Sequence, residues 1–130
     1  MRLLLDTQVA ICALNDAKKL SAPSQSLIAD ETNDIFVSVV SIWEIAIKFP
    51  MAKRFGHPPF SSAVAMQAFY DAGFGTIDVN ARHVVRVESL PPIHGDPFDR
   101  LLVAQAIDEP LWFLTADAIL ANYSELVILN

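Results

Sequence analysis

The sequence predicts a single α/β domain over residues 1–130, with a central, mostly parallel sheet flanked by helices on both faces. Short apolar segments alternate with stretches of helical periodicity along the chain, which is typical of consecutive strand–helix–strand units. The length of 130 residues fits one domain, and the hydrophobic fraction of 53% is sufficient for a core. With only 4 glycines, the connections between elements are expected to be short.

The first half of the chain contains two predicted strands, each followed by helical periodicity. The run Leu3-Leu4-Leu5 ends at Asp6, and Ile35-Phe36-Val37 is a second apolar run, so both indicate buried strands. The helices expected here extend from Asp6 to about Leu14, from Pro23 to about Asp30, and from Ser41 to Lys48. Pro50 predicts a kink in any continuation of the last helix.

The second half of the chain alternates in the same way. Gly73 and the loops at 56–59 and 90–95 separate its elements, because glycine and proline interrupt regular structure. The expected elements are a helix from 60 or 61 to 72, a strand over 75–79, a helix over 81–88, a helix from 97 to about 108, a strand over 111–114, a short helix from 117 and a strand near 127–129.

Carboxylates stand at almost every predicted junction between a strand and the next helix. Asp6 follows the first strand, Glu44 lies in the first helical turn after the second, and Asp117 opens the last short helix. Asp96 and Asp99 open the helix that starts at position 97. Because ligands of parallel sheets bind outside the carboxyl ends of the strands, we expect these acids to share one edge of the structure.

Helix capping is an alternative explanation for each of these acids. Ser41 and Glu44 match a capping box, and Asp96 before Pro97 matches an N-cap followed by proline at the first helical position. Caps are common and contribute about 1 kcal/mol each, so either interpretation explains a single acid equally well. Capping does not explain why the acids converge at one edge between almost purely apolar strands.

A bound divalent cation explains that convergence. Ionised carboxylates within a few ångströms of one another raise one another's pKa values, and a cation between them removes the repulsion. Oxygen ligands without cysteine suit Mg²⁺, with Mn²⁺ as a substitute, better than Zn²⁺. The sequence therefore predicts a magnesium site at this edge.

Four segments resemble the motifs of PIN-domain ribonucleases, most closely those of VapC-type toxins of bacterial type II toxin–antitoxin systems. They are LLDT at 4–7, SVVSIWEIA at 38–46, HGDPFDRLLVAQA at 94–106 and LTAD at 114–117. The third segment is the most specific, and together the four span most of the chain in the family's order. Gln8 departs from the pattern, because a histidine often stands at that position in these toxins.

The resemblance implies a role for each acid and a PIN-like fold. The matching positions are Asp6, Glu44 and Asp99 for the metal-binding acids, Asp117 for a fourth that often acts through water, and Thr115 for the polar residue that helps to hold the site. Asp96 matches either a further acid of the site or the cap of its helix, and we prefer the cap. The family hydrolyses RNA phosphodiester bonds to leave a 5′-phosphate and a 3′-hydroxyl. The resemblance also implies an RNA substrate, with transfer RNA among the candidates, a cognate antitoxin and a homodimer.

An arginine, the histidines and the tryptophans are further candidates for a role in the site. Arg100 either contacts a phosphate or orients Asp99, or it forms a structural ion pair, and the structural interpretation is preferred. No two of the three histidines share a metal-ligand spacing, so none is assigned to catalysis. Trp43 and Trp112 lie in apolar segments and are expected in the core.

The charge pattern leaves the nucleic-acid partner open. A net charge of −6 argues against nucleic acid, but cations bound to clustered acids reverse the local sign. The basic residues Lys48, Lys53, Arg54 and His57 fall within ten positions. RNA contact and an ordinary solvated helix end explain this cluster equally well.

The helix predicted to end at Ala72 carries more apolar surface than a small domain buries easily. Its large apolar residues are Phe60, Val64, Met66, Phe69 and Tyr70. The excess indicates a shared surface, either in a homodimer or in a groove for an antitoxin segment. The resemblance implies both, with a basic side chain of the antitoxin near the acids.

A cytoplasmic location is expected. Cys12 is the only cysteine, so no internal disulfide can form, and its apolar helical surroundings predict inert packing. The first acid comes too early for a signal peptide, and no apolar stretch is long enough to cross a membrane.

Two alternatives to a ribonuclease remain. A receiver domain of a response regulator has a similar length and an acidic Mg²⁺ pocket, but it requires an acid pair after the first strand and a late lysine. Here Thr7 follows Asp6, and no lysine occurs beyond Lys53. The second alternative is a PIN-like scaffold that binds partners without cleaving RNA, against which the four intact acids argue.

Overall fold

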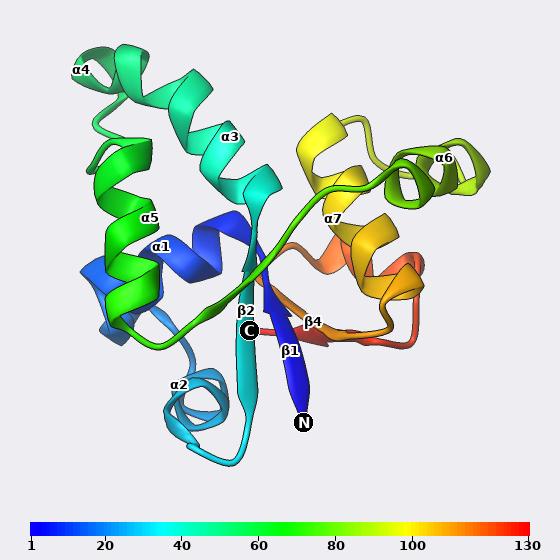
Figure 1. The fold of residues 1–130 in the computed structure, drawn as a ribbon, viewed down its shortest axis with the longest axis horizontal. Helices are drawn as coiled ribbons and strands as arrows, with labels where there is room; N and C mark the ends of the chain where they lie inside the picture. The colour runs from blue at the N-terminus through cyan, green and yellow to red at the C-terminus, as the bar shows by residue number, and fades with distance from the viewer.

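Five short apolar strands pair in parallel at the centre of the molecule (Figure 1). A computed structural model describes residues 1–130. The strands are β1 (Arg2–Leu5), β2 (Asp34–Ser38), β3 (Gly75–Ile77), β4 (Trp112–Thr115) and β5 (Val127–Leu129). Their order in the sheet is β3-β2-β1-β4-β5, and all the pairings are parallel. The predicted α/β class is confirmed, and the order differs from the 2-1-3-4-5 arrangement of flavodoxin-like folds that a receiver domain would have.

The helices lie on both faces of this sheet (Figure 1). They are α1 (Thr7–Asn15), α2 (Ala22–Ala29), α3 (Val39–Lys48), α4 (Ala52–Phe55), α5 (Ser62–Asp71), α6 (Ala81–Ser89) and α7 (Pro97–Asp108), with 3₁₀ segments η1 (Ala17–Lys19), η2 (Phe49–Met51) and η3 (Ala118–Asn122). As Pro50 predicted, the helix after β2 continues through a 3₁₀ turn into a separate short helix. No helix combines the length and apolar character that a membrane crossing requires.

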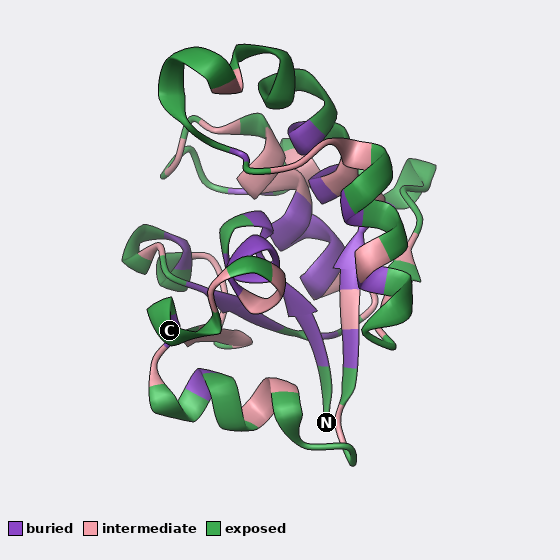
Figure 2. Ribbon diagram, turned by 90° about the vertical axis from the view of Figure 1, so that its left-hand side faces the viewer, coloured by how far each residue is buried: buried purple, intermediate pink, exposed green.

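Alternation along the strands divides the core into two layers. Leu3 and Leu5 of β1 face the layer that includes α1 and α5, whereas Leu4 faces the layer that includes α7. Figure 1 shows α1, α2 and α5 on one side of the sheet and α6 and α7 on the other. Buried residues concentrate on the strands and on the helix faces that contact them, and the outer faces are exposed (Figure 2). This packing holds the carboxyl ends of the strands in fixed positions.

The helix that carries Glu44 begins earlier than the sequence predicted. Ser38, not Ser41, is the N-cap, because the Ser38 hydroxyl accepts a hydrogen bond from the backbone N–H of Val40 at 3.0 Å. The predicted capping box with Glu44 is therefore wrong, and Glu44 lies in the second turn of α3. Without a capping role, Glu44 needs another explanation for its place near the strand ends.

The predicted core positions of both tryptophans are also wrong. Trp43 is 49% exposed on the outer side of α3, where its ring meets the edge of Phe98 at 4.7 Å between centroids. Trp112 is 38% exposed because it is the first residue of β4, ahead of the buried part of that strand. Both lie in apolar segments, but a segment's composition does not show which of its residues face outward.

Candidate active site

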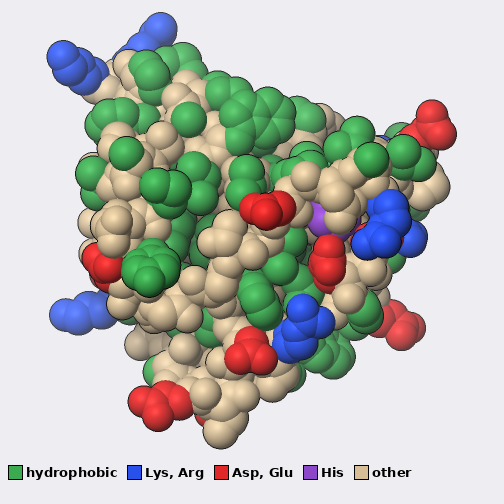
Figure 3. Space-filling view, in the orientation of Figure 1, with side chains coloured by type: hydrophobic (Ala, Val, Ile, Leu, Met, Phe, Trp, Pro, Cys, Tyr) green, Lys and Arg blue, Asp and Glu red, His purple; other side chains and the backbone are tan.

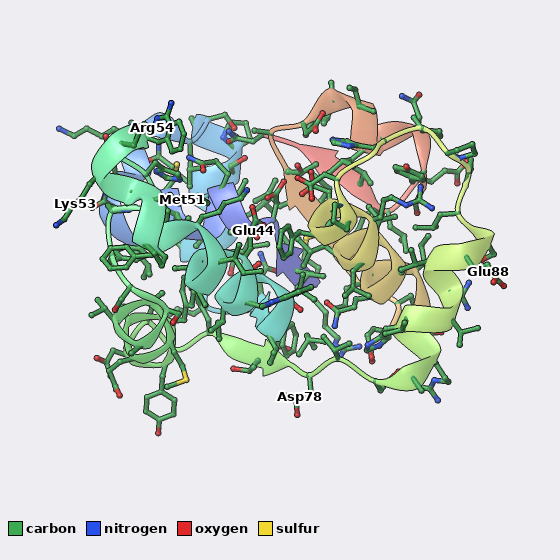
Figure 4. All side chains as sticks on the ribbon, turned by 90° about the horizontal axis from the view of Figure 1, so that it is seen from above. Glu44, Met51, Lys53, Arg54, Asp78 and Glu88 are labelled. Atoms are coloured by element: carbon green, nitrogen blue, oxygen red, sulfur yellow. The ribbon has the colours of Figure 1, made fainter.

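The acids predicted from the strand–helix junctions lie around one cavity of about 390 Å³ at the carboxyl ends of the strands. Its acidic lining residues are Asp6, Glu44, Asp96, Asp99 and Asp117. Figure 4, viewed from above, shows the Glu44 side chain near the middle of the molecule, between α3 and α7. Segments distant in sequence therefore supply carboxylates to one place.

Asp6 is held at the base of this cavity by hydrogen bonds to both of its carboxylate oxygens. It is the N-cap of α1, and its Oδ1 accepts from the backbone N–H of Gln8 at 3.1 Å. Its Oδ2 accepts from the hydroxyl of Thr115. Burial raises the pKa of Asp6 against the opposing effect of these hydrogen bonds, and the charges of Glu44 and Asp117 raise it further.

Glu44 has one paired and one unpaired oxygen. The Lys48 ammonium, one turn along α3, donates to Oε2 at 2.5 Å. Burial of Lys48 opposes its charge, but the hydrogen bond and the charge of Glu44 outweigh burial and raise the pKa of Lys48. Oε1 of Glu44 is buried and has no hydrogen-bond partner. An unpaired buried carboxylate oxygen costs free energy and is explained when a ligand satisfies it.

Asp96 and Asp99 have different roles at the start of α7. The backbone N–H groups of Phe98 and Asp99 donate to Oδ1 of Asp96, at 2.8 and 3.2 Å respectively. Asp96 is therefore the cap of α7, which confirms the preferred interpretation. The Asp99 carboxylate accepts no backbone hydrogen bond from this turn. Burial raises the pKa of Asp99 to about 7, with the charges of Asp6, Asp96 and Glu44 adding to the effect. A bound cation would stabilise the ionised form of this carboxylate.

Thr115 and Asp117 complete the site from the end of β4. The Thr115 hydroxyl donates to Asp6 and accepts from the backbone N–H of Asp117 at 3.1 Å, so it links the first and last acidic segments. Asp117 is the N-cap of η3, with its Oδ1 accepting from the N–H of Ile119 at 3.0 Å. One carboxylate oxygen of Asp117 therefore caps η3, and the cap does not use the other oxygen.

His94 lies beside two of these acids, although the sequence analysis assigned no histidine to the site. Its Nε2 is 2.9 Å from Oδ2 of Asp117 and 3.4 Å from Oδ2 of Asp99. These three side chains bring potential ligand atoms within 4.8 Å of one another. The signal in the sequence that links this residue to an acid is that His94 stands five residues before Asp99.

Arg100 and the basic cluster are arranged differently from their predicted possibilities. The Arg100 guanidinium donates to the carbonyl oxygens of Val87 at 3.1 Å and Pro91 at 2.9 Å, so it contacts neither Asp99 nor the cavity and forms no ion pair. Both predicted roles of Arg100 are thus wrong, since the N–H groups of its side chain donate to backbone carbonyl oxygens at the end of α6 and in the loop before α7.

Only half of the basic cluster reaches the site. Lys48 and His57 line the cavity with the acids. Lys53 and Arg54 point away from it, outward from α4 at the edge of the molecule (Figure 4). Lys53 and Arg54 therefore fit the interpretation as a solvated helix end, and RNA contact stays a prediction for Lys48 and His57.

The side chains present fit a hard divalent cation. The cavity offers carboxylate oxygens from separate elements and no thiolate, which suits Mg²⁺ or Mn²⁺. The unpaired oxygen of Glu44 is one sign that this cluster suits a cation, and the pKa values of Asp6 and Asp99, raised by burial and by the charges of neighbouring acids, are another. Asp99 and Asp117, with His94, bring potential ligand atoms within 4.8 Å of one another, and Asp6 and Glu44 line the same cavity.

Comparisons with known proteins agree with this arrangement. The model of the PIN domain family matches residues 3–126. The fold is similar to the crystal structure of VapBC2 from Rickettsia felis bound to a DNA fragment from their promoter, with a TM-score of 0.71 and 18% sequence identity over 100% of this chain and 98% of that chain. A comparison with curated proteins gives no match. Because the family model covers nearly the whole chain, the chain belongs to the PIN-domain family.

Proposed function

We propose that this protein is a metal-dependent endoribonuclease toxin of the VapC type, inhibited by a cognate antitoxin. The observation that carries the proposal is the convergence of Asp6, Glu44, Asp99 and Asp117 on one cavity, where Oε1 of Glu44 is buried without a partner. PIN-family membership and the motifs that resemble VapC toxins support the same function.

Hydrolysis of the phosphodiester bond follows from the chemistry of this site. A bound Mg²⁺, or Mn²⁺ in its place, offsets charge that develops on the phosphate oxygens and lowers the pKa of a water that it binds. Asp6, Glu44 and Asp99 would hold the cation, and Thr115 fixes the carboxylate of Asp6 through a hydrogen bond. Asp117 lies where it can orient the attacking water or accept its proton. The expected products carry a 5′-phosphate and a 3′-hydroxyl.

The RNA is proposed to approach across the basic wall of the cavity. Lys48 of α3 and His57 of the loop after α4 line the cavity together with the acids. A lysine ammonium is a compact point charge suited to a phosphate oxygen. Lys48 pairs with Glu44 in this structure, and a phosphate anion bound beside a cation at Glu44 would provide an alternative partner for it.

The proposed partners are an antitoxin and a second copy of the chain. Exposed apolar side chains lie on the neighbouring helices α3 and α5, and we call them together the α3–α5 face; its residues are Trp43, Ile47, Val64, Met66 and Tyr70. Figure 3 shows hydrophobic atoms gathered over the part of the molecule where α3 lies. Grouped exposed apolar side chains are typical of interaction surfaces. The structural similarity to a VapBC2 complex supports an antitoxin as one occupant. The proposed setting is the cytoplasm.

The experiment that tests the proposal is cleavage of a panel of single-stranded and transfer RNAs in Mg²⁺ or Mn²⁺. We expect cutting by the purified protein that chelator abolishes and that Asp6→Asn reduces by about 100-fold or more. Glu88→Gln is the matched control, because Glu88 is exposed on α6 at the far edge of the molecule (Figure 4). Cutting that survives Asp6→Asn would come from a contaminant. A folded protein that cuts no RNA in either metal would favour the non-cleaving scaffold.

A further inference from the structure

We infer that His94 is a positioning residue of the proposed nuclease site, where its Nε2–H group orients the carboxylate of Asp117. The inference rests on the proposed function for its catalytic consequence, but not for its geometry. His94 belongs to the loop before α7, and none of its contacts is explained by packing of the core. Two of them involve carboxylates of the site.

The backbone fixes which ring nitrogen of His94 carries the hydrogen. The backbone N–H of Asp96 points to Nδ1 of His94 at 3.1 Å. A backbone N–H can only donate, so Nδ1 accepts and the hydrogen of the neutral ring lies on Nε2. That hydrogen is directed at Oδ2 of Asp117, 2.9 Å away, with Oδ2 of Asp99 at 3.4 Å.

This tautomer argues for a hydrogen-bond donor and against a metal ligand. A histidine that binds a metal through one nitrogen generally donates its other N–H to an acceptor. Here the other nitrogen, Nδ1, faces a donor. Binding of a metal at Nε2 would therefore either move the single N–H hydrogen of the ring to Nδ1 and break the contact with Asp96, or leave the ring with no N–H hydrogen. His94 is therefore suited to hold Asp117 in place while the oxygens of the acids face the cation.

A clamp of three side-chain contacts holds the loop that carries His94. The hydroxyl of Tyr123 accepts from the backbone N–H of His94 at 2.8 Å and from the Arg100 guanidinium at 3.1 Å. Arg100 also donates to the carbonyl oxygen of Pro91 at 2.9 Å, within the same loop. This gives Arg100 a role that its position next to Asp99 did not reveal, since it supports the site through the loop and not through a phosphate.

Both carboxylate oxygens of Asp117 then accept a hydrogen bond, each from a different donor. Oδ1 accepts from the N–H of Ile119 and Oδ2 from Nε2 of His94. Asp117 is 34% exposed at its side chain, so without His94 only the hydrogen bond from Ile119 would restrict its rotation toward solvent. A carboxylate that must orient a water benefits from such restraint, because small displacements of a reacting group reduce rates strongly.

The first test is the tautomer of His94 in the metal-free protein, read from the nitrogen-15 chemical shifts of the imidazole rings. We expect His94 in the Nε2–H form, and Asp117→Asn to shift its Nε2 signal. A His94 ring in the Nδ1–H form would overturn the inference. This measurement needs neither RNA nor metal, so it remains decisive if the protein proves not to be a nuclease.

The second test compares His94→Phe, which removes the donor, with His94→Gln, whose amide can donate from a position close to Nε2. We expect His94→Phe to lower kcat by about 10- to 100-fold with KM for RNA changed less than about 3-fold, and His94→Gln to restore most of kcat. In an Asp117→Asn background, His94→Phe should have little further effect. Equal kcat values for wild type and His94→Phe, or full additivity with Asp117→Asn, would overturn the inference. Loss of cleavage in the wild type itself would instead count against the proposed function.

Discussion

Single residues in this site combine two roles that the sequence could not separate. Asp6 and Asp117 are both N-caps and members of the acidic cavity, because the N-terminus of a helix that follows a parallel strand opens at the ligand-binding edge. Asp96 also caps a helix and lines the cavity, whereas Glu44 lines the cavity without capping any helix. Capping thus accounts for some acids of the cavity and not for others, and only the hydrogen bonds distinguish them.

Asp99→Asn is predicted to stabilise the metal-free protein at alkaline pH while abolishing cleavage. The pKa of Asp99 is about 7 in the folded state and near 3.8 when unfolded, so between these values the folded state binds more protons. The free energy of unfolding of the wild type therefore falls as pH rises through this window. In chelator at pH 8, we expect Asp99→Asn to be more stable than wild type by about 1–3 kcal/mol, measured by urea denaturation.

The difference in the free energy of unfolding between Asp99→Asn and wild type should decrease as the pH falls toward 4, because the wild-type carboxyl is then protonated in the folded state. Asp71→Asn, which removes an exposed charge at the end of α5, is the control and should show no such dependence. An Asp99→Asn variant that is less stable than wild type at pH 8 would contradict the raised pKa of Asp99.

Lys48→Met is predicted to weaken RNA binding more than catalysis. If Lys48 contacts a phosphate, its loss should raise KM by about 10-fold and reduce by about one the slope of log affinity against log salt concentration. Lys53→Met removes a charge that points away from the cavity and is the matched control (Figure 4). An unchanged KM and salt slope for Lys48→Met would mean that Lys48 serves only as the partner of Glu44.

At the scale of elements, a strand or helix was predictable but its first residue often was not. Ser38 and Ser41 both precede apolar helical positions, and the sequence favoured Ser41 because a glutamate stands three residues later. In the structure β2 passes directly into α3, and Ser38 is fixed there because its hydroxyl also donates to the buried side chain of Gln105 on α7. This hydrogen bond joins residues 67 positions apart, so the start of α3 depends on a contact that the local sequence does not reveal.

The start of α7 gives a prediction that separates capping from catalysis. Asp96→Ala should lower the free energy of unfolding by about 1 kcal/mol, because two backbone N–H groups lose their acceptor. Its kcat at saturating Mg²⁺ should change by less than about 10-fold, since the backbone N–H that contacts His94 remains. Asp96→Asn should recover the stability. A loss of activity as large as that of Asp6→Asn would make Asp96 an acid of the metal site.

At the scale of the whole molecule, the sequence predicted the parallel α/β class and the edge at which the acids meet. Alternating elements and acidic junctions are local features, and the rule about carboxyl ends converts them into a spatial expectation. The strand order was not predictable, because placing β1 between β2 and β4 depends on pairing between distant segments. For the same reason His94 and His57, which come from loops, were missed as neighbours of the acids.

The α3–α5 face is predicted to form a homodimer. We expect sedimentation equilibrium to give twice the chain mass of 14.3 kDa, and Tyr70→Glu, which places a charge on the most exposed large residue of this face, to shift the population toward monomer. Glu88→Gln should leave the mass unchanged. A wild-type protein that remains monomeric at high concentration would contradict the homodimer and leave the antitoxin as the proposed occupant of this face.

The most direct test of the metal centre is equilibrium binding of Mn²⁺, followed through the electron paramagnetic resonance signal of the free ion. The wild type should bind Mn²⁺ with an affinity that Asp6→Asn and Glu44→Gln each weaken by about 10-fold or more, while Glu88→Gln binds as the wild type does. Excess Mg²⁺ should displace the bound Mn²⁺. If Asp6→Asn and Glu44→Gln bind Mn²⁺ as tightly as the wild type, the acids at the strand ends do not form a cation site and the proposed chemistry is wrong.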